Sequence, residues 1–289
     1  MASRSRAWRS GMATLPVILL GCHRVTAHVE EGVHTPAANF SVFDGIEYRH
    51  KPPSADLGMI PINGTGSFWA NDADRSEVDS QQIRKVIRQI AGTAAMLYVD
   101  IENWDVCHVS DSVTARSMLK LGRVLDLARS AAPSAKFGLY SILPQRDYWS
   151  VVNGDSAALR AWRSCNARLT PLSHKVDVVF PSLYTFYDDS IGWEKYARAN
   201  LREARRYGKP VIAFLWPEFH DSNATLRGKF LSGAFWRKEL ELCRAEADGI
   251  VVWSAGHAEW NESAEWWTET KEFLAGLQSE APRRDLPLR

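Results

Sequence analysis

The segment "AAMLYVDIENWDV", residues 94–106, joins an apolar run to a group of polar and aromatic side chains. Ala94–Val99 is mostly apolar, as expected of a strand that is buried on both faces in a parallel sheet. Asp100 and Glu102 follow at once. Side chains two positions apart on a strand point to the same side, so we expect both carboxylates to face one way while Ile101 packs on the other.

Further apolar runs of strand type recur along the chain, at residues 42–48, 57–62, 136–140, 176–180, 210–215 and 249–253. Amphipathic stretches of helical length separate them, at residues 76–92, 111–133, 156–172, 192–207, 229–246 and 262–277. The first of these ends at Gly92, a residue typical of helix C-termini, and the second opens with the capping residues Asp111 and Ser112.

Strands alternating with helices predict βαβ units and a parallel sheet. The glycine fingerprint of a dinucleotide-binding fold does not follow any predicted strand. Seven or so units over about 240 residues favour a barrel over an open sheet. We therefore expect an α/β fold, a TIM-like (β/α) barrel with about seven or eight parallel strands.

The composition is that of an ordinary globular protein. The chain has 289 residues, is 45% hydrophobic and 24% charged, and carries a formal net charge of +1. Near-neutral charge without a basic stripe gives no reason to expect nucleic acid as a partner. We expect a monomer. The twelve tryptophans are more than usual, and some are predicted to line a groove for a ligand with flat apolar faces, such as a sugar.

The N-terminus has the pattern of an export signal. Arg4, Arg6 and Arg9 precede the short apolar run "MATLPVILL", which ends in Leu-Leu-Gly-Cys at Cys22. This resembles the lipobox of bacterial lipoproteins and implies that Cys22 receives a lipid; an ordinary signal peptide with a chance cysteine is the alternative. We expect a signal peptide at 1–22, a tether at 23–40, one catalytic domain at 41–280 and a tail at 281–289. The protein would then lie in the cell envelope, lipid-anchored in the outer membrane or periplasm, or be secreted, with the lipid as its sole membrane contact.

Three cysteines remain once Cys22 is set aside: Cys107, Cys165 and Cys243. An odd number allows at most one disulfide, and at least one buried free thiol is expected. No pair among them has metal-ligand spacing, and we expect no metal site. We also expect no cofactor.

The predicted strand ends carry carboxylates, tyrosines and tryptophans. The C-terminal ends of the strands are where a (β/α) barrel builds its active site. Aromatic faces stack on sugar rings, and carboxylates act as acid and base on glycosidic bonds. Two neighbouring carboxylates resist double ionisation, so one of Asp100 and Glu102 is expected to keep a proton near neutral pH.

Four groups of residues resemble motifs of the hyaluronidase family of glycoside hydrolases. They are "YVDIENW" at 98–104, "KFGLYSILPQRDYW" at 136–149, "VVFPSLYTFYDD" at 178–189, and "PVIAFLWPEF" at 210–219 followed by "DGIVVWSAGH" at 248–257. They occur in the family's order over roughly residues 57–257. The resemblance implies a distorted (β/α) barrel and a polysaccharide or oligosaccharide substrate.

The resemblance also implies roles for single residues. Glu102 would be the proton donor and later the base, and Asp100 would orient the substrate's 2-acetamido group, whose oxygen replaces an enzyme nucleophile. Tyr184 would hydrogen-bond that group or the carboxylates, and Trp253 would floor the sugar pocket. Tyr148 matches the family's other site tyrosine better than Tyr140 does. Two further tryptophans, Trp216 and Trp104, are expected to line or support the site.

The chain departs from animal hyaluronidases in its cysteine positions, its shorter loops, its lipobox and its lack of a cysteine-rich C-terminal module. These departures widen the expected substrates to other polymers that contain N-acetylhexosamine. Arg146 is one of several arginines that could supply local positive charge for a polyanion.

Glu218 leaves two alternatives open. It follows a late strand, where many barrel glycosidases carry a nucleophile, so Glu102 and Glu218 would form a two-carboxylate retaining pair. It would otherwise be an exposed loop acid. A third hypothesis is a surface lipoprotein that binds glycans without cleaving them.

Overall fold

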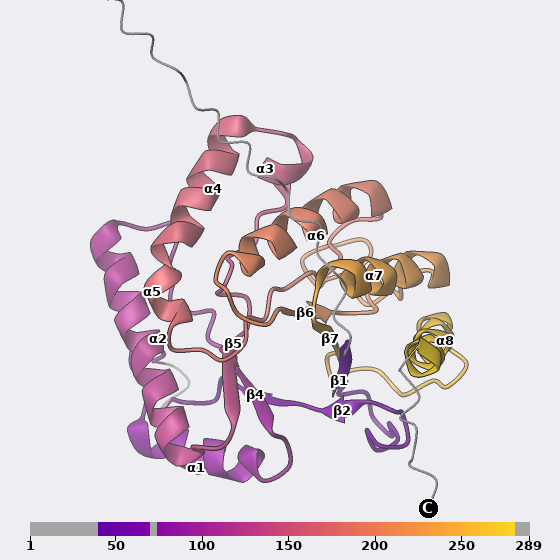
Figure 1. Ribbon diagram of the computed structural model, residues 1–289, viewed down its shortest axis with the longest axis horizontal. Helices are drawn as coiled ribbons and strands as arrows, with labels where there is room; N and C mark the ends of the chain where they lie inside the picture. The colour runs from indigo at the N-terminus through magenta and orange to yellow at the C-terminus, as the bar shows by residue number, and fades with distance from the viewer. Residues whose placement is uncertain (1–39, 70–73, 281–289) are drawn as a thin grey trace, which may run out of the picture. The chain divides into compact units, whose positions relative to one another are not determined.

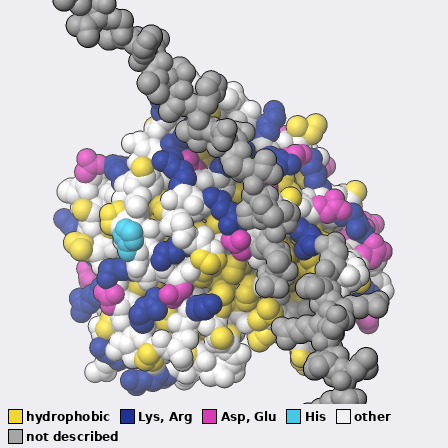
Figure 2. Space-filling model, in the orientation of Figure 1, with side chains coloured by type: hydrophobic (Ala, Val, Ile, Leu, Met, Phe, Trp, Pro, Cys, Tyr) yellow, Lys and Arg dark blue, Asp and Glu magenta, His cyan; other side chains and the backbone are white. Residues whose placement is uncertain are grey.

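The computed structural model describes residues 40–69 and 74–280. The predicted signal peptide with Cys22, the tail, and all of the tether except Phe40 lie outside these residues. Within the described part of the chain, no helix is both long and apolar enough to span a bilayer. On the face drawn in Figure 2, lysine and arginine side chains are scattered, with acidic side chains among them.

The strands form two parallel sheets. They are β1 Ser41–Gly45, β2 Ile60–Pro61, β3 Asn63–Thr65, β4 Met96–Val99, β5 Lys136–Leu139, β6 Ile212–Leu215 and β7 Gly249–Trp253. One sheet has the order β2-β1-β7-β6 and the other the order β3-β4-β5. All of these pairs are parallel, which confirms the predicted α/β class.

The two sheets are linked at both edges. Residues 60–65 supply β2 to one sheet and β3 to the other. On the far side, residues 179–182 make isolated parallel bridges with both neighbours: Phe180 with Tyr140 after β5, Val179 with Val211, and Ser182 with Phe214 of β6. Seven segments therefore follow one another in a cyclic order of parallel neighbours.

Helices separate the strands along the chain and lie around them in Figure 1. They are α1 Ser80–Ala91, α2 Asp111–Ala131, α3 Trp149–Val152, α4 Ser156–Arg168, α5 Thr170–Ser173, α6 Ser190–Arg205, α7 Gly233–Glu246 and α8 Glu265–Glu280. Aspartates at the N-caps of α1, α4 and α6 accept hydrogen bonds from backbone N–H groups of the first turn. These bonds satisfy donors that a helix start leaves open.

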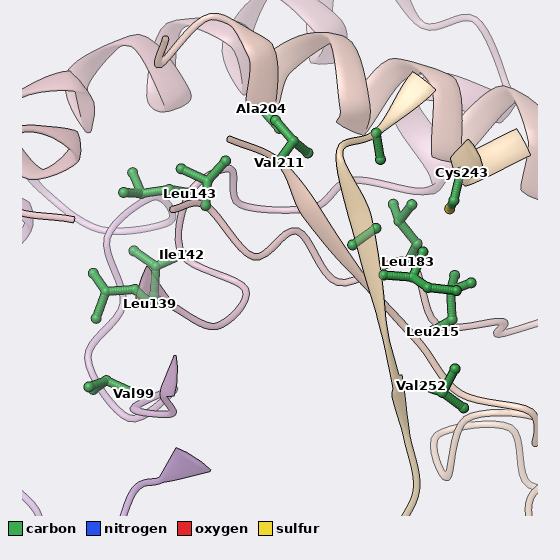
Figure 3. Packing of buried hydrophobic residues seen from close by; sticks show 14 of the residues in the cluster. Val99, Leu139, Ile142, Leu143, Leu183, Ala204, Val211, Leu215, Cys243 and Val252 are labelled. Carbon is green, nitrogen blue, oxygen red and sulfur yellow. The ribbon is translucent and has the colours of Figure 1, made fainter. Parts of the chain in front are cut away.

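Alternate residues of the seven segments enter two separate hydrophobic clusters. Each segment sends a side chain into the inner cluster: Phe43, Ile62, Tyr98, Tyr140, Phe180, Phe214 and Val251. Their neighbours enter the outer cluster, between strands and helices. Figure 3 shows Val211, Leu215 and Val252 there, together with Ala204 of α6 and Cys243 of α7. Strands with an apolar side chain on both faces explain the continuous apolar runs of the sequence.

Two predicted strands are shorter than expected. Residues 176–180 form bridges instead of a regular strand, and the predicted strand 57–62 is replaced by turns up to residue 58, then by β2 and β3. A proline lies in each place, Pro181 and Pro61. Pro61 still pairs with Asp44 in β2, after which the chain passes to the other sheet. Pro181 has no N–H to donate and lies between the isolated bridges of Phe180 and Ser182.

The helix ends also differ from the predictions. The helix expected over 229–246 begins at Gly233, because Phe230 instead bridges to Glu218. The N-cap of α2 is Ser110, which makes no side-chain capping bond, so the predicted caps at Asp111 and Ser112 are wrong. Gly92 is the C-cap of α1, with a right-handed φ of −70°.

The cysteines agree with the prediction of at most one disulfide and at least one buried free thiol. Cys107 and Cys165 form a disulfide with a Cα–Cα distance of 5.5 Å. It joins the loop after β4 to α4. Cys243 is buried and free.

We predict that Gly138→Ala destabilises the fold by about 1–3 kcal/mol, as overpacking of a core does. A Cβ at Gly138 would lie 2.5 Å from the Phe180 ring and 2.6 Å from the Val178 carbonyl oxygen. Urea unfolding measures the change. The matched control is Gly276→Ala in α8, where a Cβ meets nothing within 4 Å and stability should stay level or rise. Equal stability of the two variants would contradict the packing described for the inner cluster.

Candidate active site

Asp100 and Glu102 stand at the C-terminal end of β4, where the sequence predicts them. Leu97, Val99 and Ile101 belong to the outer cluster, whereas Tyr98 belongs to the inner one. The backbone N–H of Asp100 donates to the Thr65 carbonyl oxygen at 3.1 Å. A Cβ on Gly66 would lie 2.2 Å from the Asp100 carbonyl oxygen, so this close approach of the two chains requires glycine.

The two carboxylates have different surroundings. Asp100 is half-buried; burial, and then the charge of Glu102, raise the pKa of Asp100 to about 6. Glu102 is exposed, with 56% of its side chain accessible, and its Oε1 lies 3.8 Å from Nη1 of Arg146. The proton expected on one member of the pair is thus held most readily by Asp100.

An aromatic group lies beside this pair. The rings of Tyr184 and Trp253 stack with centroids 5.5 Å apart and planes 26° apart. Trp216 meets the edge of Trp253 at 5.0 Å, and the Tyr140 ring is 5.9 Å from that of Tyr184. Trp253 is partly exposed while the other three are buried, so Trp253 is the member of the group that a ligand can reach.

Tyr98 connects the carboxylates with the aromatic group. Burial, and then the charges of Glu47 and Asp100, raise its pKa, and its hydroxyl lies close to the Trp253 indole. Burial also raises the pKa of Tyr184, with Tyr140, Tyr98 and Asp100 adding to the effect. Ring contacts run from Tyr98 through Tyr140 and Tyr184 to Trp253, and Asp100 follows Tyr98 by two residues.

The two candidate tyrosines after β5 have different positions. Tyr140 belongs to the inner cluster and donates a hydrogen bond from its hydroxyl to Ser182 Oγ at 3.1 Å. Tyr148 packs instead against Trp149, Tyr187 and Tyr196. The structure thus brings Tyr140, the less favoured of the two, to Tyr184.

Glu218 is not the exposed loop acid that one reading of the sequence expects. Only 1% of the residue is accessible. One carboxylate oxygen accepts a hydrogen bond from the Tyr48 hydroxyl, and the other lies 3.1 Å from Nε2 of His257. Both oxygens are therefore engaged, and Glu218 fixes Tyr48 and His257.

Concave surface surrounds the carboxylates. Asp100 and Glu102 line a cavity of about 430 Å³ with Gly66, Ser67, Trp69, Arg75 and Asn103. Glu102 also lines a neighbouring cavity of about 320 Å³, together with Trp104 and Arg146. Trp104 is mostly buried, and its indole N–H donates to the Arg75 carbonyl oxygen at 2.9 Å. This placement suits the supporting part that the sequence gives Trp104.

Arg146 is held in place by an unusual turn. Ser141 has φ +57°, a left-handed conformation that costs a non-glycine residue energy, and its Oγ accepts a hydrogen bond from Nη1 of Arg146. The Arg146 guanidinium also lies over the Phe186 ring at 5.4 Å.

Tyr98 was not predicted as a site residue from the sequence. Arg146 was predicted only as one of several arginines that could supply positive charge. Tyr98 could have been found, because it lies two residues before Asp100 and so shares its face. Among residues 40–69 and 74–280 there is no group of three or more histidine, cysteine or acidic side chains able to hold a metal ion.

Comparison with known proteins identifies the fold. No protein-family model matches the chain, and no curated protein matches its sequence. A structure of bee venom hyaluronidase is similar at 18% identity with a TM-score of 0.54, covering 83% of this chain and 97% of the bee chain. A second, in complex with a hyaluronic acid tetramer, has 17% identity and a TM-score of 0.55, with 86% and 100% covered.

A β-glycosidase is also similar, at 12% identity and a TM-score of 0.50, with 87% of this chain and 84% of the other covered. The fold is thus shared with TIM-barrel glycoside hydrolases, bee venom hyaluronidase among them. At these identities the similarity establishes the fold alone.

We predict that Asp100→Asn removes part of the pH dependence of stability. The pKa of Asp100 is raised from 3.8 to about 6 in the folded state, so the native protein binds more protons than the unfolded chain between these values. Stability from this group is therefore present at low pH and lost as pH rises through about 6, by about 1–2 kcal/mol. Urea unfolding at about pH 4.5 and about pH 7.5 compares the two proteins.

Glu102→Gln is the companion variant for this measurement. It removes the second cause of the raised pKa but leaves the burial of Asp100, so it should keep most of the dependence. Identical pH profiles for the wild type and Asp100→Asn would contradict the described environment of Asp100.

Proposed function

We propose that this protein is a glycoside hydrolase that cleaves polysaccharides containing N-acetylhexosamine, by a retaining, substrate-assisted mechanism. The observation that carries the proposal is the joint position of Asp100, Glu102, Tyr184 and Trp253 at the C-terminal ends of parallel strands. The fold shared with bee venom hyaluronidase supports it. The cyclic pairing of the seven strand segments supports a distorted (β/α) barrel as the scaffold.

In the proposed first step the pair of carboxyl groups carries one proton. In the substrate complex Asp100 is ionised and the proton is on Glu102, which delivers it to the glycosidic oxygen. Its exposed carboxyl group can reach that oxygen, whereas Asp100 lies deeper. The carbonyl oxygen of the substrate's 2-acetamido group attacks the anomeric carbon as the leaving group departs. This displaces the aglycone and forms a cyclic intermediate without a bond to the protein.

In the second step Glu102, now ionised, takes a proton from a water molecule that opens the intermediate. Asp100 would orient the acetamido N–H, and its carboxylate would offset the positive charge that develops there. Tyr184 would hydrogen-bond the same group, with Tyr140 beside it, and the partly exposed face of Trp253 would carry the sugar ring.

A two-carboxylate mechanism with Glu218 as nucleophile is the second candidate that the sequence raises. The burial of Glu218 and its bonds to Tyr48 and His257 favour a supporting part instead. Export through the N-terminal signal, with a lipid on Cys22 as the membrane anchor, belongs to the same proposal, as does action as a monomer that needs neither metal nor cofactor.

We predict that Glu102→Gln lowers cleavage of hyaluronan, chondroitin or chitin oligosaccharides by about 10²–10⁴-fold, the range typical of lost general acid–base catalysis. The exposed side chain and the conservative change should leave the fold intact, as measured by circular dichroism and urea unfolding. Product masses from a glycan hydrolysis screen give the rate and the linkage cut.

The matched control is Glu262→Gln, an exposed glutamate that lines neither of the cavities around Glu102 and should keep full activity. Full activity of Glu102→Gln would refute the proposal. If Glu218→Gln abolishes cleavage while a thiazoline inhibitor has no effect, the two-carboxylate mechanism replaces it. Binding without cleavage throughout the screen would indicate a glycan-binding lipoprotein.

A further inference from the structure

A third cavity extends the concave surface away from Asp100. It has a volume of about 780 Å³ and is walled by α3, α4 and the loops after β4 and β5. It shares His108, Gln145 and Arg146 with the cavity of about 320 Å³, which in turn shares Glu102 with the cavity around Asp100. The three cavities therefore adjoin one another through shared lining residues, and we call the row that they form the groove.

Two exposed aromatic side chains stand at the far end of this groove. Trp149 is 52% accessible and Tyr187 is 36% accessible, and their ring centroids are 4.8 Å apart. We call this pair the aromatic shelf. Leaving an indole half exposed forgoes the burial that tryptophan normally gains, so a shelf of this kind marks a binding surface.

The aromatic shelf packs against further aromatic rings. The buried ring of Tyr148 packs against Trp149 at 5.1 Å and against Tyr187 at 5.0 Å. Tyr148 in turn contacts Tyr196 of α6 at 5.3 Å. The disulfide between Cys107 and Cys165 ties two other walls of the same cavity together. A surface fixed before binding loses little conformational entropy when a ligand arrives.

Polar groups surround the shelf within the cavity. Arg146 and Arg168 bring guanidinium groups, and Gln145 brings an amide. Arg146 is fixed by Ser141 and Arg168 is paired with Asp111. A flat apolar face ringed by a few hydrogen-bonding groups is the surface that a pyranose ring fits.

We propose that the aromatic shelf is a sugar-binding subsite, distal to the bond that is cut, for a ring of the same glycan chain that lies at Glu102. The inference rests on the proposed function, because the position of Glu102 in the same groove is what selects a glycan as the occupant. Tyr148 is then a positioning residue beneath the subsite and does not itself contact the sugar at the reaction centre.

The test compares short and long ligands. Tetrasaccharides and decasaccharides of hyaluronan, chondroitin and chitin are titrated calorimetrically into the Glu102→Gln protein, with and without Trp149→Ala. Truncation of a tryptophan anchor should weaken decasaccharide binding by roughly tenfold more than tetrasaccharide binding. Tyr187→Ala should act in the same direction. Because both side chains are exposed, these variants should fold normally.

Leu119→Ala is the matched control, since Leu119 is a 76% accessible apolar side chain on α2, away from the groove, and should change nothing. Equal losses for both ligand lengths, no loss, or no binding of any of the oligosaccharides would overturn the subsite.

The two proposals fail separately. Unchanged decasaccharide affinity in Trp149→Ala, alongside loss of cleavage in Glu102→Gln, removes the subsite and leaves the function. Continued cleavage by Glu102→Gln refutes the proposed mechanism. The subsite is then tested by comparing the KM values for the short and long oligosaccharides with and without Trp149→Ala.

Discussion

The parallel register of β4 between β3 and β5 determines which side chains reach the interior. Leu97 pairs with Asn63 on one side and with Phe137 on the other, and this register places Tyr98 inward and Val99 outward. A shift by one residue would exchange the two faces, burying Asp100 among the helices and turning Ile101 toward the interior. The position of the carboxylates thus depends on backbone hydrogen bonds made several residues before them.

The same alternation explains which features could be predicted from the sequence. β7 has the predicted bounds, and the position of Asp100 and Glu102 after β4 needs only the two-residue period. Local pattern failed at two predicted strands, where residues 57–62 form only the short β2 and residues 176–180 form only isolated bridges. It also failed after β5, where Ser141 turns with a positive φ and leaves Tyr140 rather than Tyr148 beside Tyr184.

The burial of Glu218 could not be predicted from the local sequence, for a different reason. Its partners Tyr48 and His257 are 170 and 39 residues away along the chain, so only the folded arrangement brings them to it. Unlike the exposed Glu102, Glu218 is enclosed and hydrogen-bonded on both oxygens. Two glutamates at similar places after their strands therefore have different chemical environments.

The disulfide between Cys107 and Cys165 makes the loop after β4 sensitive to the redox state of its surroundings. It closes a span of 58 residues that begins five positions after Glu102, and in the chain-entropy account such a closure stabilises the folded state by about 4 kcal/mol. In a reducing compartment the two thiols stay separate, and the loop after β4 is free of its tie to α4. The redox state of its surroundings is therefore part of what shapes the groove, because the tie between the loop after β4 and α4 exists only where these two thiols are oxidised.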